Sequence, residues 1–84
     1  MKPIFDNRIK QWRLNNKLHR EDGPAYEWID GSKFWYLNGL LHREDGPAIE
    51  YARSGSKRWF YHGKQIDCKD NQEFLRMIKL KIFL

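Results

Sequence analysis

The sequence predicts a mainly β protein, an antiparallel β-meander of hairpin repeats of about 23 residues with one C-terminal α-helix as a cap. The eight-residue string LHREDGPA stands at 18–25 and again, unchanged, at 41–48. Aromatic-rich segments with alternating polarity lie between turn pairs, which is typical of strands. The stretch at about 70–82 instead spaces its apolar residues at a helical period. A chain of 84 residues forms one small domain.

The repeat reaches beyond the identical string. Trp12 and Trp35 stand 23 positions apart (35 − 12), and Trp59 follows after 24 more (59 − 35). Self-similarity at such a period indicates stacked supersecondary units, none of which buries a face alone. We therefore treat 1–84 as one repeat domain, with units at about 9–31 and 32–55, a partial unit at 56–67 and the helix at about 70–82.

The segments AYEWID and KFWYLN form the first predicted hairpin. Asp30-Gly31 between them is a signal for a two-residue type I′ turn, in which both central residues have positive φ. This register places Tyr26 opposite Trp35 and Ile29 opposite Ser32. One side of the pleat then carries Tyr26, Trp28, Trp35 and Leu37.

The second hairpin, AIEYARSGSKRWFYHG, has one residue more. A slip of one residue would turn the aromatic set onto the wrong face. A three-residue loop at 53–55 absorbs the insertion, with Gly55 in the left-handed position of a G1 bulge. The predicted register places Ala52 opposite Ser56 and Ile49 opposite Trp59.

A second kind of turn closes KFWYLN onto LLHR at Asn38-Gly39, and Asn15-Asn16 is its weaker counterpart. HREDGP then follows as the corner between successive hairpins. In this corner we expect Gly46 to supply backbone freedom, Pro47 to preset φ and Asp45 to bond neighbouring amides.

The histidines of the corner are expected to be held by a carboxylate or a backbone carbonyl, and the Arg–Glu pair to lie at the rim. A residue set that recurs with the architectural period is explained more simply as architecture than as a site. A binding role and a catalytic role for the same residues are the alternatives. The predicted structural motif comprises His19, Asp22, Gly23, Pro24, His42, Asp45, Gly46 and Pro47.

The C-terminal segment begins with Asp70 and, three residues later, Glu73, a pair that resembles a capping box. Apolar residues follow at helical spacing, which predicts a helix over about 70–82. We expect this helix to cover one sheet face or the open end of the array. Because LRMIKLKIFL is both apolar and basic, the alternative is a helix that lies on a membrane surface.

The face opposite the tryptophans is the candidate partner-binding surface. Aromatic rings interleaved with arginine can stack bases or grip an acidic protein patch. Glu27 and Glu50 are expected among these residues, where they would repel phosphates and disfavour nucleic acid. The alternative is that the helix or a second copy of the chain covers this face. The candidate residues are Arg13, Phe34, Tyr36, Arg58 and Phe60, with Gln11 and Ile29 beside them.

Composition narrows the classes of function. A net charge of +5 favours an acidic partner, protein or nucleic acid. The single cysteine, Cys68, excludes an internal disulfide and fits a reducing compartment. No signal-peptide pattern or window of membrane-spanning length occurs, so we expect no membrane insertion and a cytoplasmic location.

Catalysis and metal binding find little support in the sequence. His19, His42, His62 and Cys68 lack the tight spacing of a structural zinc site. No oxyanion motif, third orienting residue or glycine-rich phosphate loop accompanies them. We expect no catalytic residue, no metal, no cofactor and no enzymatic activity.

The string HREDGPA, followed by a strand, a D-G-S turn and W-Y-x-N-G, resembles repeat proteins of bacteriophages and large DNA viruses. The period and the order N-G…H…G…D-G…W are similar to a variant of MORN repeats, which form antiparallel hairpin meanders. The resemblance covers residues 9–63. It implies a small viral accessory protein that binds a host component stoichiometrically.

Together these observations favour a non-enzymatic interaction protein of viral type, which inhibits or redirects a host protein with an acidic surface in the host cytoplasm. The alternative is a basic nucleic-acid-binding module that uses the aromatic and arginine sheet face. The sequence leaves a homodimer open.

Overall fold

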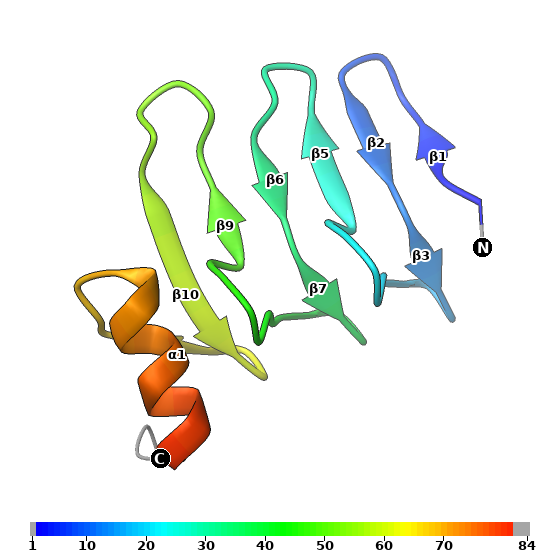
Figure 1. Cartoon of the computed structure of the whole chain (residues 1–84). Coiled ribbons are helices and arrows are strands. Elements are labelled where there is room, and N and C mark those ends of the chain that lie inside the picture. Colours follow the sequence, from blue (N-terminus) through cyan, green and yellow to red (C-terminus); the bar gives the residue numbers. More distant parts are fainter. Residues whose placement is uncertain (1, 82–84) are drawn as a thin grey trace.

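The computed structural model describes residues 2–81. The chain forms a series of short strands followed by one C-terminal helix (Figure 1). This confirms the predicted mainly β meander of antiparallel hairpins. No helix in the described range is long and apolar enough to span a membrane. The elements are β1 (Ile4–Phe5), β2 (Ile9–Gln11), β3 (Arg13–Leu14), β4 (Lys17–Leu18), β5 (Tyr26–Trp28), β6 (Lys33–Phe34), β7 (Tyr36–Leu37), β8 (Leu40–Leu41), β9 (Ile49–Glu50), β10 (Lys57–Tyr61), β11 (Lys64–Ile66) and α1 (Asn71–Leu80).

Three long strand paths organise the sheet. Two of them run through a tryptophan, from β2 through Trp12 to β3 and from β6 through Trp35 to β7, and the third is β10 with Trp59. The first part of each path belongs to the sheet of order β1-β2-β5-β6-β9-β10-β11. The second part pairs with the short strand that follows it, as β3–β4, β7–β8 and β10–β11.

Two short strands lie between each pair of neighbouring long paths: β4 and β5 in the first case, β8 and β9 in the second. The chain leaves the sheet after β4 or β8, crosses one face of the sheet as the corner, and returns to the sheet as β5 or β9. Trp12 lies at this split: its N–H donates to the Ala25 carbonyl at 2.8 Å, and its carbonyl accepts from the His19 N–H at 3.0 Å. Trp35 repeats this arrangement with Ala48 and His42 at the same distances.

The turns at the lower ends of the long paths, as drawn in Figure 1, have the predicted chemistry. Asn15 and Asn16 have φ of 52° and 64°, and Asn38 and Gly39 have 51° and 81°. The third unit repeats the turn at His62-Gly63, with φ of 48° and 85°. Positive φ at both central residues defines a type I′ turn, which matches the twist of the strands it joins.

The predicted register of the other hairpins is wrong by one residue. Tyr26 lies opposite Phe34, not Trp35, because the loop is Ile29–Asp30–Gly31 rather than Asp30-Gly31 alone. The Trp28 N–H donates to the Ser32 carbonyl, so these two residues form the last pair before the loop. Asp30 accepts from the Ser32 N–H at 2.8 Å, which favours this longer loop.

The second loop carries the same error. Ile49 lies opposite Arg58 instead of Trp59, and Tyr51, not Ala52, is bonded to Ser56. The loop therefore runs over 52–55 instead of 53–55. Gly55 has the predicted left-handed φ, 73°, and the extra residue of this unit is absorbed in the loop as expected.

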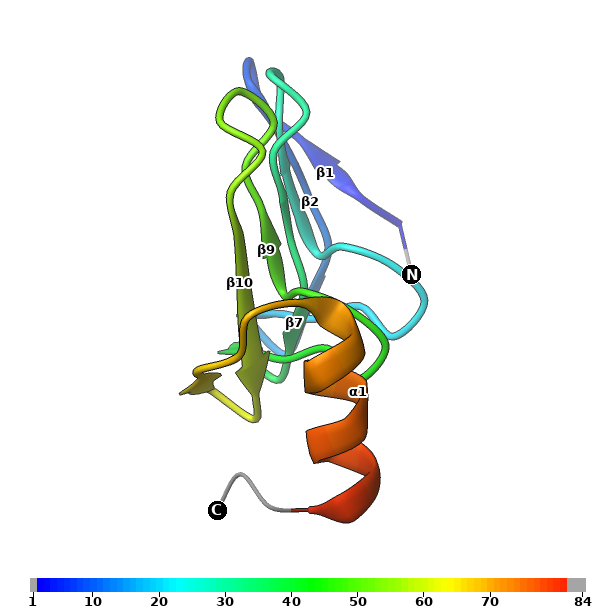
Figure 2. The ribbon, with the colours of Figure 1, turned by 60° about the vertical axis from the view of Figure 1, so that its left-hand side comes forward.

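The register divides the side chains between two faces, because neighbours along a strand point to opposite sides. We call the side that carries Trp12, Trp35 and Trp59 the tryptophan face. Figure 2 shows α1 and the corners on one side of the sheet. The other side, which we call the open face, carries in its central row Gln11, Tyr26, Phe34, Ile49 and Arg58.

The helix completes the tryptophan face at the C-terminal end. Asp70 accepts from the Glu73 N–H at 2.8 Å, as predicted, while the Glu73 carboxylate accepts from the Lys69 N–H. Phe74 is fully buried and forms with Trp59 and Ile66 an apolar cluster on this face. The helix spans Asn71–Leu80, inside the predicted 70–82, of which residue 82 lies outside the described residues.

We predict that Gly63→Ala destabilises the fold more than Gly55→Ala. Both glycines have positive φ, which costs an alanine about 1–2 kcal/mol. At Gly63 the new Cβ would also lie 3.2 Å from Leu40 Cδ2, whereas at Gly55 no other atom lies within 4 Å. Urea unfolding followed by tryptophan fluorescence measures both variants, and equal losses would contradict the packing of Leu40 against the third turn.

Candidate functional site: two arginine corners and an open aromatic face

Each corner returns its arginine over the preceding tryptophan. The Arg20 guanidinium carbon lies 3.8 Å from the Trp12 ring centroid, and Arg43 lies 3.8 Å from that of Trp35. Such cation–π contacts are favourable, and more so when partly desolvated. The expectation that the Arg–Glu pair lies at the rim is therefore wrong for the arginine, which is inside the corner.

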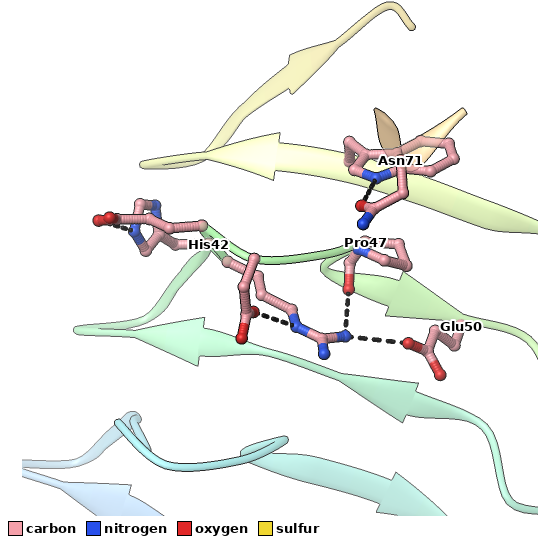
Figure 3. A network of polar contacts seen from close by, with 8 residues as sticks. His42, Pro47, Glu50 and Asn71 are labelled. Carbon is pink, nitrogen blue, oxygen red and sulfur yellow. Dashed lines mark hydrogen bonds and ion pairs between the residues drawn. The ribbon is translucent and has the colours of Figure 1, made fainter. Parts of the chain in front are cut away.

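The second corner shows what the arginine joins (Figure 3). The Arg43 guanidinium donates to Asp45 at 2.8 Å, to the Pro47 carbonyl at 3.1 Å and to Glu50 at 2.9 Å. Asp45 thus accepts from arginine in place of the neighbouring amides that we expected. The first corner has the same set, Arg20 with Asp22 at 3.0 Å, Pro24 at 3.2 Å and Glu27 at 4.0 Å.

The corner glycines serve close packing, not backbone freedom. Neither Gly23 nor Gly46 has positive φ. A Cβ on Gly46 would lie 2.9 Å from the Arg43 guanidinium carbon, and one on Gly23 would lie 2.8 Å from that of Arg20. The predicted role of Gly46 is corrected accordingly: a side chain at this position would displace the Arg43 guanidinium from its present place.

The corner histidines are buried structural acceptors. His42 is 4% exposed, and its Nδ1 accepts from the His62 N–H at 2.8 Å, while Nε2 lies 3.1 Å from Glu44. His19 likewise accepts from the Asn38 N–H at 2.9 Å. The expected carboxylate is present, but a backbone amide takes the place of the expected carbonyl. Because Nδ1 accepts, the proton of the neutral ring lies on Nε2.

A groove of about 610 Å³ separates the two corners, with Trp35 and Leu37 among its lining residues. Carboxylates from both corners also line it, and the arginines of the corners are paired with acids. No group of three or more His, Cys, Asp or Glu side chains within residues 2–81 is arranged to hold a metal ion.

Burial raises the pKa of the Cys68 thiol to about 11, and the carboxylates of Glu73, Asp67 and Asp70 add to this effect. The thiol is therefore protonated at neutral pH.

The five candidate partner-binding residues all lie on the open face of the sheet. Phe34 and Tyr36 are two apart along one long path, as are Arg58 and Phe60 along another. Arg13 follows Gln11 by two positions on the first path, and Gln11 lies opposite Tyr26 in the central row. Ile29 is instead at a loop tip and is 76% exposed.

Glu27 and Glu50 do not lie on this face, contrary to expectation. They lie opposite Lys33 in the register and contact the corner arginines, on the tryptophan face. The one-residue error in loop length caused the wrong assignment, since it exchanges the two faces of a strand. No strand position on the open face, within the described residues, carries a carboxylate, and its charged strand residues are Arg13 and Arg58.

The rings of the open face hold one another edge to face. Tyr26 and Phe34 have centroids 5.6 Å apart with planes at 82°, and Phe34 and Tyr51 are 6.0 Å apart at 86°. Burial raises the pKa of the Tyr36 phenol, and the phenols of Tyr26 and Tyr51 add to this effect. The predicted register places Tyr26 and Trp28 on the tryptophan face. Trp28, at 41% exposure, extends this aromatic row instead.

No family model, curated protein or solved structure matches this chain.

We predict that His19→Ala and His42→Ala each destabilise the protein by about 1–3 kcal/mol, because each removes a buried imidazole from the packing together with the acceptor of a part-buried backbone amide. Glu44→Gln is the control: glutamine can still accept from His42 Nε2–H, so it should change the unfolding free energy by less than about 0.5 kcal/mol. Urea denaturation measures all three. A fully stable His42→Ala would show that the corner does not depend on its imidazole.

Proposed function

We propose that this chain is a non-enzymatic binding protein whose open face docks a protein partner that carries acidic residues around an apolar patch. The observation that carries the proposal is the uncovered face itself: aromatic rings and two arginines, without a carboxylate at any described strand position. Tyr, Trp and Arg are the residues enriched at binding hot spots. On the viral resemblance, the partner is a host protein that the chain blocks or redirects in the host cytoplasm.

The positive charge of the open face favours binding of a different protein over binding of a second copy of this chain. Two open faces placed against each other would each present Arg13 and Arg58, and neither would offer a carboxylate at a described strand position to pair with them. Like charges across an interface are costly. A partner with carboxylates near the edges of an apolar patch meets both arginines and the rings at once.

Single-stranded nucleic acid is the second candidate, favoured by the position of Glu27 and Glu50 on the other face. Phosphates would therefore meet no strand carboxylate on the open face. The arginines limit this function, because two cations predict a logarithmic salt dependence of only about −1.4 for a single strand. The rings also stand nearly perpendicular to one another, which suits mutual packing better than a ladder of stacked bases.

We predict that the double variant Arg13→Ala with Arg58→Ala loses the partner. The matched control is Lys33→Ala with Lys57→Ala, which removes the same charge from exposed positions on the tryptophan face. Both variants and the wild type are used as bait in host lysate at moderate salt, and a fifteen-nucleotide oligothymidine is titrated in parallel.

Recovery of one protein by the wild type and the lysine variant, but not by the arginine variant, is the expected result. Oligothymidine binding that depends on Arg13 and Arg58, with no protein recovered, would replace the proposal by the nucleic-acid function. If both double variants lose binding equally, net charge alone is responsible and the open face has no specific role.

A further inference from the structure

Two equivalent joints connect successive units of the array. At the first, the Asn38 N–H donates to His19 Nδ1 at 2.9 Å and the Gly39 N–H donates to the Leu18 carbonyl at 2.8 Å. At the second, the His62 N–H donates to His42 Nδ1 at 2.8 Å and the Gly63 N–H donates to the Leu41 carbonyl at 2.7 Å. Each joint thus fastens a lower turn to the histidine of the preceding corner.

The joints differ in the residue that begins the turn. Asn38 has an uncharged side chain, whereas His62 places a second imidazole on the first. The His62 and His42 rings are stacked, with centroids 4.1 Å apart and planes at 21°. The Tyr61 ring lies 4.9 Å from the His42 ring and closes another side. The second joint therefore contains two titratable rings in contact, and the first contains one.

Acid acts on the second joint through His42 Nδ1. A proton there would point at the His62 N–H, so two donors would face each other and the hydrogen bond would be lost. Burial lowers the pKa of His42, and the His62 charge adds to this, while the hydrogen bond and charge of Glu44 oppose it. Protonation of His42 in acid therefore strains the joint instead of reinforcing it.

Other charged groups near His42 come from the corners. Arg43 follows it in the chain and is paired with Asp45 and Glu50. Glu21 and Asp22 of the first corner line the same groove as His42. Of these neighbours, Glu44 is the carboxylate in direct contact with the ring.

We propose that the stacked rings of His42 and His62 make the second joint more acid-sensitive than the first, so that the third turn is released from the second corner in acid. A proton on the accepting Nδ1 breaks the bond at either joint, but at the second joint it also places a cation against another titratable ring. The folded pKa of His42 is lowered below its ordinary value, so the unfolded or opened state binds more protons in acid. The stability that His42 contributes is present above about pH 6.5 and is lost as the pH falls through the lowered folded pKa.

Amide exchange measured by NMR tests the joint in the intact chain. Protection factors of the His62 and Gly63 amides are compared with those of Asn38 and Gly39 at pH 7.5 and 5.0. We expect the second pair to lose more protection in acid than the first, because the second joint holds two imidazoles in contact. The opening constant grows by up to about tenfold for each unit by which the folded pKa of His42 is lowered.

Exchanging the turn residues provides matched variants. His62→Asn gives the second joint the residue of the first, and its acid-induced loss of protection should shrink. Asn38→His should introduce acid sensitivity at the first joint, since Asn38 and His62 have nearly the same φ, 51° and 48°. Both variants keep the backbone donor, so folding is expected to persist and is checked by circular dichroism.

Equal acid sensitivity of both joints in the wild type would overturn the proposal, because general acid destabilisation would then suffice. An unchanged pH response in His62→Asn would overturn it as well, since the imidazole pair would have no part in the effect. A second joint that stays fully protected at pH 5.0 would also contradict it. Transfer of acid sensitivity to the first joint by Asn38→His would support it directly.

Discussion

The stack of a corner arginine on a tryptophan is the interaction on which the array depends. Arg43 lies over Trp35 and at the same time bonds Asp45, Pro47 and Glu50, so one side chain ties the corner to the strand beneath it and to the strand that follows. A sheet one layer thick offers little apolar material for a core. In this protein, charge-assisted hydrogen bonds and a cation–π contact supply part of the stabilisation that a larger apolar core would give.

This interaction explains the composition of the repeated string. The arginine needs the aspartate and the later glutamate as acceptors, and it needs the glycine because a Cβ would collide with its guanidinium. The histidine accepts the amide of the next turn, so the corner also fastens the following unit. The string therefore repeats because its residues contact one another within the corner and fasten the next unit.

The two ends of the array depart from the repeat for physical reasons. Trp59 has no third corner above it, and Phe74 and Asn71 of the helix take its place, with Asn71 accepting from the indole N–H at 3.0 Å. Gly39 and Gly63 are approached by Lys17 and Leu40 of the preceding unit, at 3.5 and 3.2 Å from the position that a Cβ would occupy. The first turn has Asn16 at the equivalent position, where no described unit precedes it.

Much of this architecture follows from the sequence alone. The period, the turns at Asn15-Asn16 and Asn38-Gly39 and the capped helix depend on local patterns, and local backbone preferences decide them. The gathering of Arg13, Phe34, Tyr36, Arg58 and Phe60 on one face follows from the alternation of side chains along the long paths. The register was not decided locally, because Asp30-Gly31 suits a two-residue turn as well as the end of a three-residue loop. Tertiary structure chose the longer loop and so moved Glu27 and Glu50 to the tryptophan face. It also decided that arginine lies on tryptophan, since residues eight apart in the chain, such as Arg20 and Trp12, meet only when the corner folds back over the sheet.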